Sequence, residues 1–255
     1  MNDMLIRIYG DSISLPRYTQ GIDLLDTWPE KLRKMFEEYS GGNVSIFNRS
    51  LGGGSIKEIF KIYSRDAGYF DGSNSTVIFF LGIVDCAPRP IPKWTRMLVG
   101  KLPWARRQMI VKFLHNNRSR IQKIKYYNIT SKQKFKSLYE KMVELAGAQG
   151  NQVLLVSIGP VSDNMKRHSF GLEKEINAYN NIIKNICASH DNAKMIAIQD
   201  NLLYKEYCSK YQDSEIFLND AHHYTNLGNE MVAKIIFRAL INMCNNNEKK
   251  GRCYE

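Results

Sequence analysis

Thr76–Gly82 reads TVIFFLG, a continuous apolar run that ends at a glycine. Strands buried on both faces of a parallel sheet have this pattern, whereas half-exposed strands alternate apolar and polar residues. Outward from this run in both directions, the chain contains further short apolar runs bounded by turn residues. We expect a strand at each of them, namely Leu5–Tyr9, Val44–Phe47, Gln152–Ser157 and Lys194–Gln199.

Segments with helical spacing of apolar residues lie between these strands. The expected helices are Trp28–Tyr39, Ile56–Ser64, Ser131–Ala148, Leu172–Ser189, Asn201–Lys210 and Thr225–Met243. Strands that alternate with helices indicate a parallel sheet covered on both faces. We therefore predict an α/β fold, a three-layer α/β/α sandwich with about five parallel strands. Residues 1–245 form a single domain in this interpretation, and residues 246–255 form a polar tail.

The composition of the 255-residue chain, with 44% apolar residues, is that of a folded domain rather than a disordered segment. Its five cysteines are scattered without the spacing of a zinc site, so we expect reduced thiols, no metal and no cofactor. The start of the chain lacks a signal-peptide pattern, and no segment has the roughly 18 apolar residues of a membrane span. These features predict a soluble, cytoplasmic protein.

The net charge of +11 is concentrated in one region, because Cys86–Tyr139 contains fourteen Lys or Arg and no Asp or Glu. Residues 88–130 of this region read as a basic, mainly helical insertion between the third and fourth strands. One candidate partner is an anionic glycan or nucleotide-linked sugar. Another is an anionic membrane surface, such as the inner face of the membrane, which the amphipathic stretch Trp104–Leu114 would contact. It contains no nucleic-acid-binding module, so nucleic acid is not expected. Alternatively, the region is a solvated pair of helices packed on the domain.

Two short motifs contain residue types that carry chemistry. Gly10-Asp11-Ser12 follows the first strand, where a serine hydroxyl reaches the sheet edge, although this motif alone is more typical of a turn or helix cap. Asp220 lies three residues before His223, ahead of the last helix. The aspartate could hold the imidazole through Nδ1–H and leave Nε2 as a base toward a serine. Alternatively, Asp220 or Thr225 only caps that helix.

Four stretches, taken in order, resemble the sequence blocks of the SGNH or GDSL hydrolase superfamily: LIRIYGDSIS (5–14), FNRSLGGGS (47–55), VIFFLGIVD (77–85) and LNDAHHYTNLGN (218–229). The resemblance implies a serine enzyme that hydrolyses or transfers an acyl group. It assigns the nucleophile to Ser12, the base to His223 and the orienting acid to Asp220. The backbone N–H groups of Ser12 and Gly53 would bind the oxyanion.

The third block departs from the superfamily pattern, because Val84 stands where the family has an oxyanion-binding asparagine. One such donor is worth roughly 3–4 kcal/mol of transition-state stabilisation. Another donor, such as Arg49, Arg89 or a backbone N–H, could replace it. Alternatively, the N–H groups of Ser12 and Gly53 suffice, or the protein binds its ligand without turnover.

The run GIVDCAPRP (82–90) also resembles a variant third block of SGNH proteins from bacterial surface-polysaccharide gene clusters. This implies an O-acyl group, in particular O-acetyl, on a carbohydrate as the substrate. Candidate substrate-binding residues are Asp11, Arg49, Asp85 and Arg89, although Asp85 and Arg89 could equally form a structural ion pair. The alternatives are a lipid or thioester hydrolase acting at an anionic membrane surface and a non-catalytic glycan-binding relative.

Overall fold

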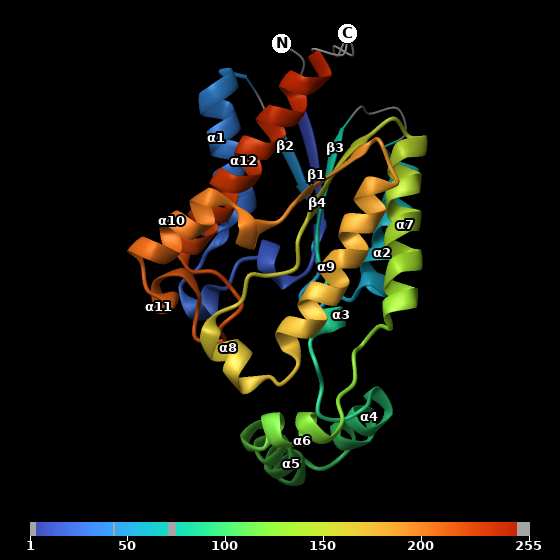
Figure 1. The fold of residues 1–255 in the computed structure, drawn as a ribbon, viewed down its shortest axis with the longest axis vertical. Helices are drawn as coiled ribbons and strands as arrows, with labels where there is room; N and C mark the ends of the chain where they lie inside the picture. The colour runs from blue at the N-terminus through green and yellow to red at the C-terminus, as the bar shows by residue number, and fades with distance from the viewer. Residues whose placement is uncertain (1–3, 43, 71–74, 249–255) are drawn as a thin grey trace.

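A computed structural model describes residues 4–42, 44–70 and 75–248 (Figure 1). Its centre is one sheet of five strands in the order β2-β1-β3-β4-β5, and every neighbouring pair is parallel. The α/β fold with five parallel strands is therefore confirmed. The strands are β1 (Met4–Gly10), β2 (Val44–Asn48), β3 (Thr76–Phe80), β4 (Gln152–Val156) and β5 (Ala193–Ile196).

Helices cover both faces of the sheet, which gives three layers (Figure 1). On one face, α1 (Trp28–Ser40) packs against α12 (Asn226–Glu248). On the other face, α7 (Lys132–Ala148) packs between α2 (Ile56–Ala67) and α9 (Leu172–Ala188). Because helices lie on both sides, all five residues of the central strand β3 are buried. This explains why its sequence is apolar without alternation.

Several elements depart from the helices and strands predicted above. The strand predicted over Lys194–Gln199 ends at Ile196, and a 3-10 turn (Ile198–Asp200) follows because the Ile198 N–H donates to Ser157 Oγ at 3.0 Å. Two short helices were not predicted, α8 (Asp163–His168) and α11 (Asp213–Ile216). Helices α10 (Leu202–Lys210) and α12 are found, and α12 continues beyond Met243 to Glu248. Residues 249–255 of the predicted tail lie outside the described residues.

The predicted basic insertion is helical and projects from the end of the sheet where the strands terminate (Figure 1). It follows the short helix α3 (Ile83–Cys86) and contains α4 (Lys93–Gly100), α5 (Trp104–Asn116) and α6 (Arg118–Ile124). The two chain segments that connect it to the domain are joined at Arg89 and Tyr127, whose backbone N–H groups donate to each other's carbonyls at 2.8 and 3.0 Å. Within the described chain, no helix is both long and apolar enough to cross a membrane.

Candidate active site

Ser12 lies immediately beyond the carboxyl end of β1, in a short 3-10 turn (Ser12–Ser14). The turn begins at Asp11, whose Oδ1 accepts a hydrogen bond from the Ile13 N–H at 3.1 Å. Gly10 allows β1 to lie close to β3, because a Cβ atom at this position would stand 2.6 Å from the carbonyl oxygen of Phe80. The end of the strand and the buried cap together fix the position of the Ser12 hydroxyl.

A continuous chain of hydrogen bonds joins Ser12, His223 and Asp220, although 211 residues separate the serine from the histidine. The Ser12 Oγ to His223 Nε2 distance is 2.7 Å, and the His223 Nδ1 to Asp220 Oδ2 distance is 2.8 Å. Burial alone would raise the pKa of Asp220, but the hydrogen bonds and charge of His223 outweigh it and hold that pKa well below its usual range. An ionised Asp220 accepts the Nδ1–H, which leaves Nε2 to accept a proton from Ser12.

The turn that carries Asp220 and His223 is tightly folded. Ala221 has a φ of 68°, an uncommon conformation for a residue with a Cβ atom. The Ala221 N–H donates to the Leu218 carbonyl at 2.7 Å, and the Ala221 carbonyl accepts from the Ser162 N–H at 3.0 Å. The Asp220 Oδ1 accepts from the His223 N–H at 3.1 Å, so the two side chains are held on the same side of the turn.

Asp220 does not cap the helix that follows. Thr225 precedes α12 and its Oγ1 accepts a hydrogen bond from the Gly228 N–H at 3.1 Å, as an N-cap residue does. The carboxylate of Asp220 instead bonds to the ring and backbone of His223. Thr225 is therefore the helix cap, and Asp220 is the partner of the His223 imidazole.

Gly53 lies in a turn beside Ser12, in which the Gly54 N–H donates to the Leu51 carbonyl at 2.9 Å. Its φ of 68° is in the left-handed region that glycine adopts without strain. Among the described residues, neither the Ser12 N–H nor the Gly53 N–H donates to a protein acceptor. Val84, in α3, lines the same pocket and offers no donor. Two backbone donors are thus available for an oxyanion.

Ser12 and His223 open into a cavity of about 910 Å³. One side is formed by the turns described above, and another by α8. The third side comes from the basic insertion, which contributes residues from the segment before α4 and from α4, α5 and α6. The insertion residues that line the cavity are Arg89, Arg96, His115, Asn116, Arg118, Ser119 and Ile129.

Of the four candidate substrate-binding residues, Arg89 alone lines this cavity. The guanidinium of Arg49 instead bonds to both carboxylate oxygens of Asp66, at 2.9 and 3.2 Å. Asp11 and Asp85 are buried, and burial is the main cause that raises their pKa to about 7 and about 6. Asp85 Oδ2 accepts from the Ile56 N–H at 2.9 Å and so holds the start of α2. Within the described residues Asp85 makes no ion pair with Arg89.

Two further side chains contact the Ser12–His223–Asp220 group. Arg17 Nη2 also donates to His223 Nε2, so that it competes with the Ser12 hydroxyl for the one lone pair of this nitrogen, and Arg17 Nη1 lies 3.7 Å from Asp220 Oδ2. The ring of His222 packs on that of His223 with centroids 3.9 Å apart, and its Nδ1–H donates to the Asp220 carbonyl at 3.1 Å. Burial, followed by the charge of His223, lowers the pKa of His222 to about 4. Nothing in the local sequence around Arg17 indicates this contact.

The same turn contains three potential metal ligands, since donor atoms of Asp220, His222 and His223 lie within 4.8 Å of one another. Both ring nitrogens of His223 and the carboxylate of Asp220 already form hydrogen bonds within the protein, so these groups have partners without an ion.

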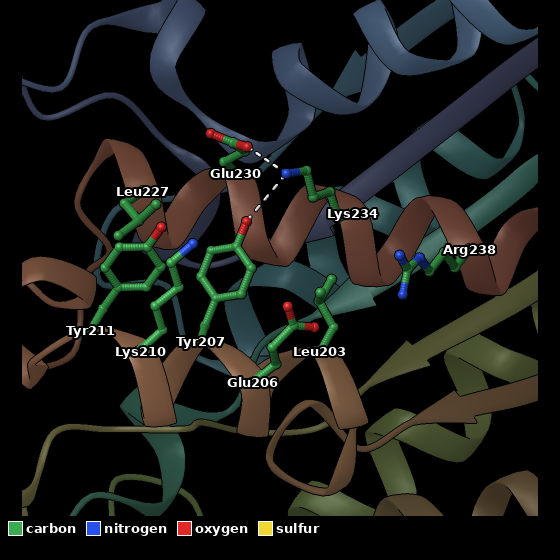
Figure 2. A pocket seen from close by; sticks show the side chains of 9 residues that line it. All are labelled: Leu203, Glu206, Tyr207, Lys210, Tyr211, Leu227, Glu230, Lys234 and Arg238. Carbon is green, nitrogen blue, oxygen red and sulfur yellow. Dashed lines mark hydrogen bonds and ion pairs between the residues drawn. The ribbon is translucent and has the colours of Figure 1, made fainter.

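A second hollow lies between α10 and α12 and contains none of these residues (Figure 2). Its volume is about 470 Å³. The Lys234 ammonium in its wall donates to Tyr207 Oη at 3.2 Å and to Glu230 Oε1 at 2.5 Å, so its central polar groups satisfy one another (Figure 2). We assign no chemistry to this hollow.

Solved structures with the same fold include several ester hydrolases. The chain is similar to a lipase/acylhydrolase from Enterococcus faecalis, with a TM-score of 0.60 and 14% identity over 93% of this chain and 95% of that chain. A catalytic mutant of an acetylxylan esterase from Geobacillus stearothermophilus gives a TM-score of 0.62 with 12% identity, over 93% and 94% of the two chains. A member of the lipolytic G-D-S-L family from Veillonella parvula gives 0.57 with 16% identity, over 92% and 97%.

These similarities show that the chain has the fold of the G-D-S-L lipases and acylhydrolases. The resemblance found in the sequence is therefore confirmed at the level of the fold. No protein-family model matches the chain, and no curated relative matches it.

Proposed function

We propose that this protein is a serine esterase-type enzyme that cleaves or transfers an O-acyl group. The observation that carries the proposal is the unbroken hydrogen-bond chain from Ser12 Oγ through His223 to Asp220, at the edge of a cavity of about 910 Å³. A carboxylate, an oriented imidazole and a hydroxyl in this arrangement activate a serine on several unrelated folds.

The reaction has two steps. In the first, His223 Nε2 takes the proton from the Ser12 hydroxyl as Oγ attacks the ester carbonyl carbon, and the same proton passes to the leaving alcohol when the ester C–O bond breaks. In the second, His223 takes a proton from water or a sugar hydroxyl as this attacks the acyl-enzyme, and returns the proton to Ser12 Oγ when the bond between Oγ and the acyl group breaks. Water yields hydrolysis and a sugar hydroxyl yields acyl transfer. Asp220 stabilises the imidazolium in both steps.

The negative charge that develops on the carbonyl oxygen is met by the N–H groups of Ser12 and Gly53. Both are without a protein acceptor in the part of the chain that the structure describes. Val84 supplies no third donor, which keeps a non-catalytic, glycan-binding relative as an alternative. Glycan binding without turnover, unchanged in Ser12→Ala, would favour that alternative.

The substrate we propose is an O-acyl, in particular O-acetyl, ester of a carbohydrate, such as a surface-polysaccharide precursor at the cytoplasmic face of the membrane. Two observations support it. Acetylxylan esterases are among the solved structures with this fold. The cavity beside Ser12 is wide and lined mainly by polar side chains, as a sugar requires.

The test of the catalytic group is covalent labelling of Ser12 by a fluorophosphonate, read by intact mass and peptide mapping. We expect one adduct, on Ser12, that disappears in Ser12→Ala and in His223→Ala. His222→Ala is the matched control, because it removes the neighbouring imidazole but leaves the Nδ1–Asp220 bond of His223 in place. Absence of an adduct on folded wild-type protein, at long times and high probe concentration, would refute the proposed activity.

A second candidate is a lipid or thioester hydrolase that acts at an anionic membrane. The observation that favours it is a set of exposed apolar side chains on the basic insertion, with exposed fractions between 54% and 75%. They are Trp94, Met97 and Leu98 on α4, and Trp104, Met109 and Phe113 on α5. Cations flanked by exposed apolar residues suit an anionic bilayer surface.

Flotation with anionic vesicles separates this candidate from an enzyme that acts on a free glycan. A membrane enzyme should float with the vesicles, less so at high salt, and Trp104→Ala should weaken flotation further. Tyr69→Ala is the control, since Tyr69 is 81% exposed but lies outside the insertion. No flotation at low salt would exclude the membrane candidate.

A further inference from the structure

Three arginines of the basic insertion meet in the wall of the cavity that contains Ser12. Arg89 lies between α3 and α4, Arg96 on α4, and Arg118 at the start of α6. All three are only half-exposed, and the Nε atom of each is buried with no hydrogen-bond acceptor. They come from three separate segments, so the folding of the insertion itself brings them together.

This group has no ion-pair partner in the part of the chain that the structure describes. Among the described residues, none of the three arginines forms an ion pair with Asp or Glu. The insertion itself supplies no partner, because Cys86–Tyr139 contains no acidic residue, and Asp220, the one carboxylate that the described chain places in the cavity wall, is bonded to His223. Burial, followed by the positive charges of Arg118 and Arg96, lowers the pKa of Arg89 to about 10. Half-buried cations that repel one another are unfavourable unless an anion joins them.

The arginines are also held in place. Arg118 Nη2 donates to the Pro88 carbonyl and to Ser169 Oγ, both at 3.2 Å. The Arg89 backbone forms both hydrogen bonds of its bridge to Tyr127. The partners in these hydrogen bonds are all neutral groups, so they hold Arg89 and Arg118 in place without cancelling the charge of the guanidinium groups. Arginine is the side chain best suited to bidentate contacts with phosphate oxygens.

We propose that Arg89, Arg96 and Arg118 form a subsite that binds a phosphate-bearing part of the substrate while the ester lies at Ser12. The substrate would then be an acyl ester of a phosphorylated compound, with a phosphomonoester or a diphosphate as the anion. Three guanidinium groups match the charge of about −2 of such a group better than the single charge of a carboxylate. This inference rests on the proposed esterase function for its reacting end, but the anion site itself is defined without it.

The test is calorimetric binding of inorganic pyrophosphate to Ser12→Ala, at constant ionic strength, so that binding is read without turnover. We expect saturable binding with one site per chain. Arg96→Gln should raise the Kd about tenfold or more, because it removes one charged donor from the site. Arg96 makes no hydrogen bond or ion pair to another described side chain, so this variant should fold normally. Arg106→Gln is the matched control, because it removes the same charge from an exposed position on α5.

Two inhibition experiments identify the kind of compound that carries the phosphate. Inhibition of short-chain ester hydrolysis by a nucleoside diphosphate sugar points to a phosphorylated carbohydrate. Inhibition only by vesicles containing phosphatidic acid points to a lipid headgroup. Either result supports the subsite, provided that Arg96→Gln weakens the inhibition and Arg106→Gln does not.

The proposal is overturned if pyrophosphate does not bind, or if Arg96→Gln and Arg106→Gln weaken binding equally, which is the mark of a diffuse positive field. The result of the pyrophosphate experiment can be distinguished from the result of the fluorophosphonate labelling. Labelling of Ser12 without anion binding leaves the esterase and removes the subsite. Anion binding without labelling leaves the subsite and removes the esterase.

Discussion

Replacing Asp220 with asparagine tests the proposed catalytic group of Ser12, His223 and Asp220 with almost no change of shape. The Asp220 Oδ1 accepts hydrogen bonds from the N–H groups of His223 and His222, at 3.1 and 3.4 Å. An asparagine would keep its oxygen there and turn its NH₂ group toward His223 Nδ1. Two donors cannot bond to each other, so the imidazole would take the tautomer with its proton on Nε2. In that tautomer Nε2 cannot accept the proton of Ser12.

We therefore expect Asp220→Asn to lower kcat for a p-nitrophenyl ester by about 10⁴-fold, which corresponds to roughly 5.5 kcal/mol of transition-state stabilisation. KM should change little, because Asp220 is part of the reacting group and its carboxylate is used by His223. If Asp220 had only a structural role, asparagine, which accepts the same backbone hydrogen bonds as aspartate, would leave both kcat and the free energy of unfolding nearly unchanged. The two interpretations therefore differ in whether kcat falls.

The assay measures kcat and KM beside the free energy of unfolding in urea for the same samples. Asp163→Asn is the matched control, because it removes the same charge from an exposed carboxylate at the start of α8. A kcat for Asp220→Asn within tenfold of the wild type, in a folded protein, would refute the assignment of Asp220 and weaken that of His223.

Three further predictions concern the oxyanion site, a buried carboxylate and the end of β1. Val84→Asn should raise kcat at least about tenfold if backbone N–H groups are the only oxyanion donors, and an unchanged kcat with intact Ser12 labelling would mean that another donor is present. Because burial raises the pKa of Asp11 from 3.8 to about 7, its stabilising contribution is full below about pH 4 and is lost as the pH rises to about 7. In urea unfolding, the free energy of unfolding of the wild type should thus fall by on the order of a few kcal/mol relative to that of Asp11→Asn as the pH rises across this range. A difference between the two proteins that stays constant with pH would contradict the argument. Gly10→Ala should cost about 1–3 kcal/mol of stability and slow Ser12 labelling, because its Cβ would lie 2.6 Å from the Phe80 carbonyl oxygen; Gly68→Ala, which meets nothing within 4 Å, should do neither.

The strands were predictable because of where they lie in the sheet. A strand covered by helices on both sides, such as Thr76–Phe80, has no polar face, so its sequence is apolar throughout. The end of β5 was not predictable in this way. Ile198 is apolar like the residues before it, but its N–H bonds to Ser157 Oγ on the neighbouring segment and the strand ends earlier. That contact depends on tertiary structure and leaves no local pattern.

The same distinction holds for the site. Asp220 and His223 are three residues apart, so their contact is a matter of local spacing that the sequence displays. Ser12 could be joined to them only through the resemblance to a known superfamily. Arg17 belongs to the group only through contacts across some 200 residues, and no periodicity or motif indicates such a contact. Arg49 is the opposite case. Its place in the block FNRSLGGGS suggested a role in binding the oxyanion or the substrate, but its side chain pairs with Asp66.

The basic insertion shows why composition alone could not separate a solvated surface from a functional one. A solvated helical pair would direct its cations outward and its apolar side chains toward the domain. Helix α4 departs from this pattern at Arg96, which lines the cavity, while Trp94 and Met97 are 65% and 59% exposed. This arrangement is the one that the two proposals require: an anion subsite needs arginines that line the cavity, and a surface that contacts a bilayer needs apolar side chains that face outward. Three of the fourteen cations of Cys86–Tyr139, namely Arg89, Arg96 and Arg118, line the cavity beside Ser12. The binding of pyrophosphate tests this inner face of the insertion, and the flotation of the protein tests its outer face.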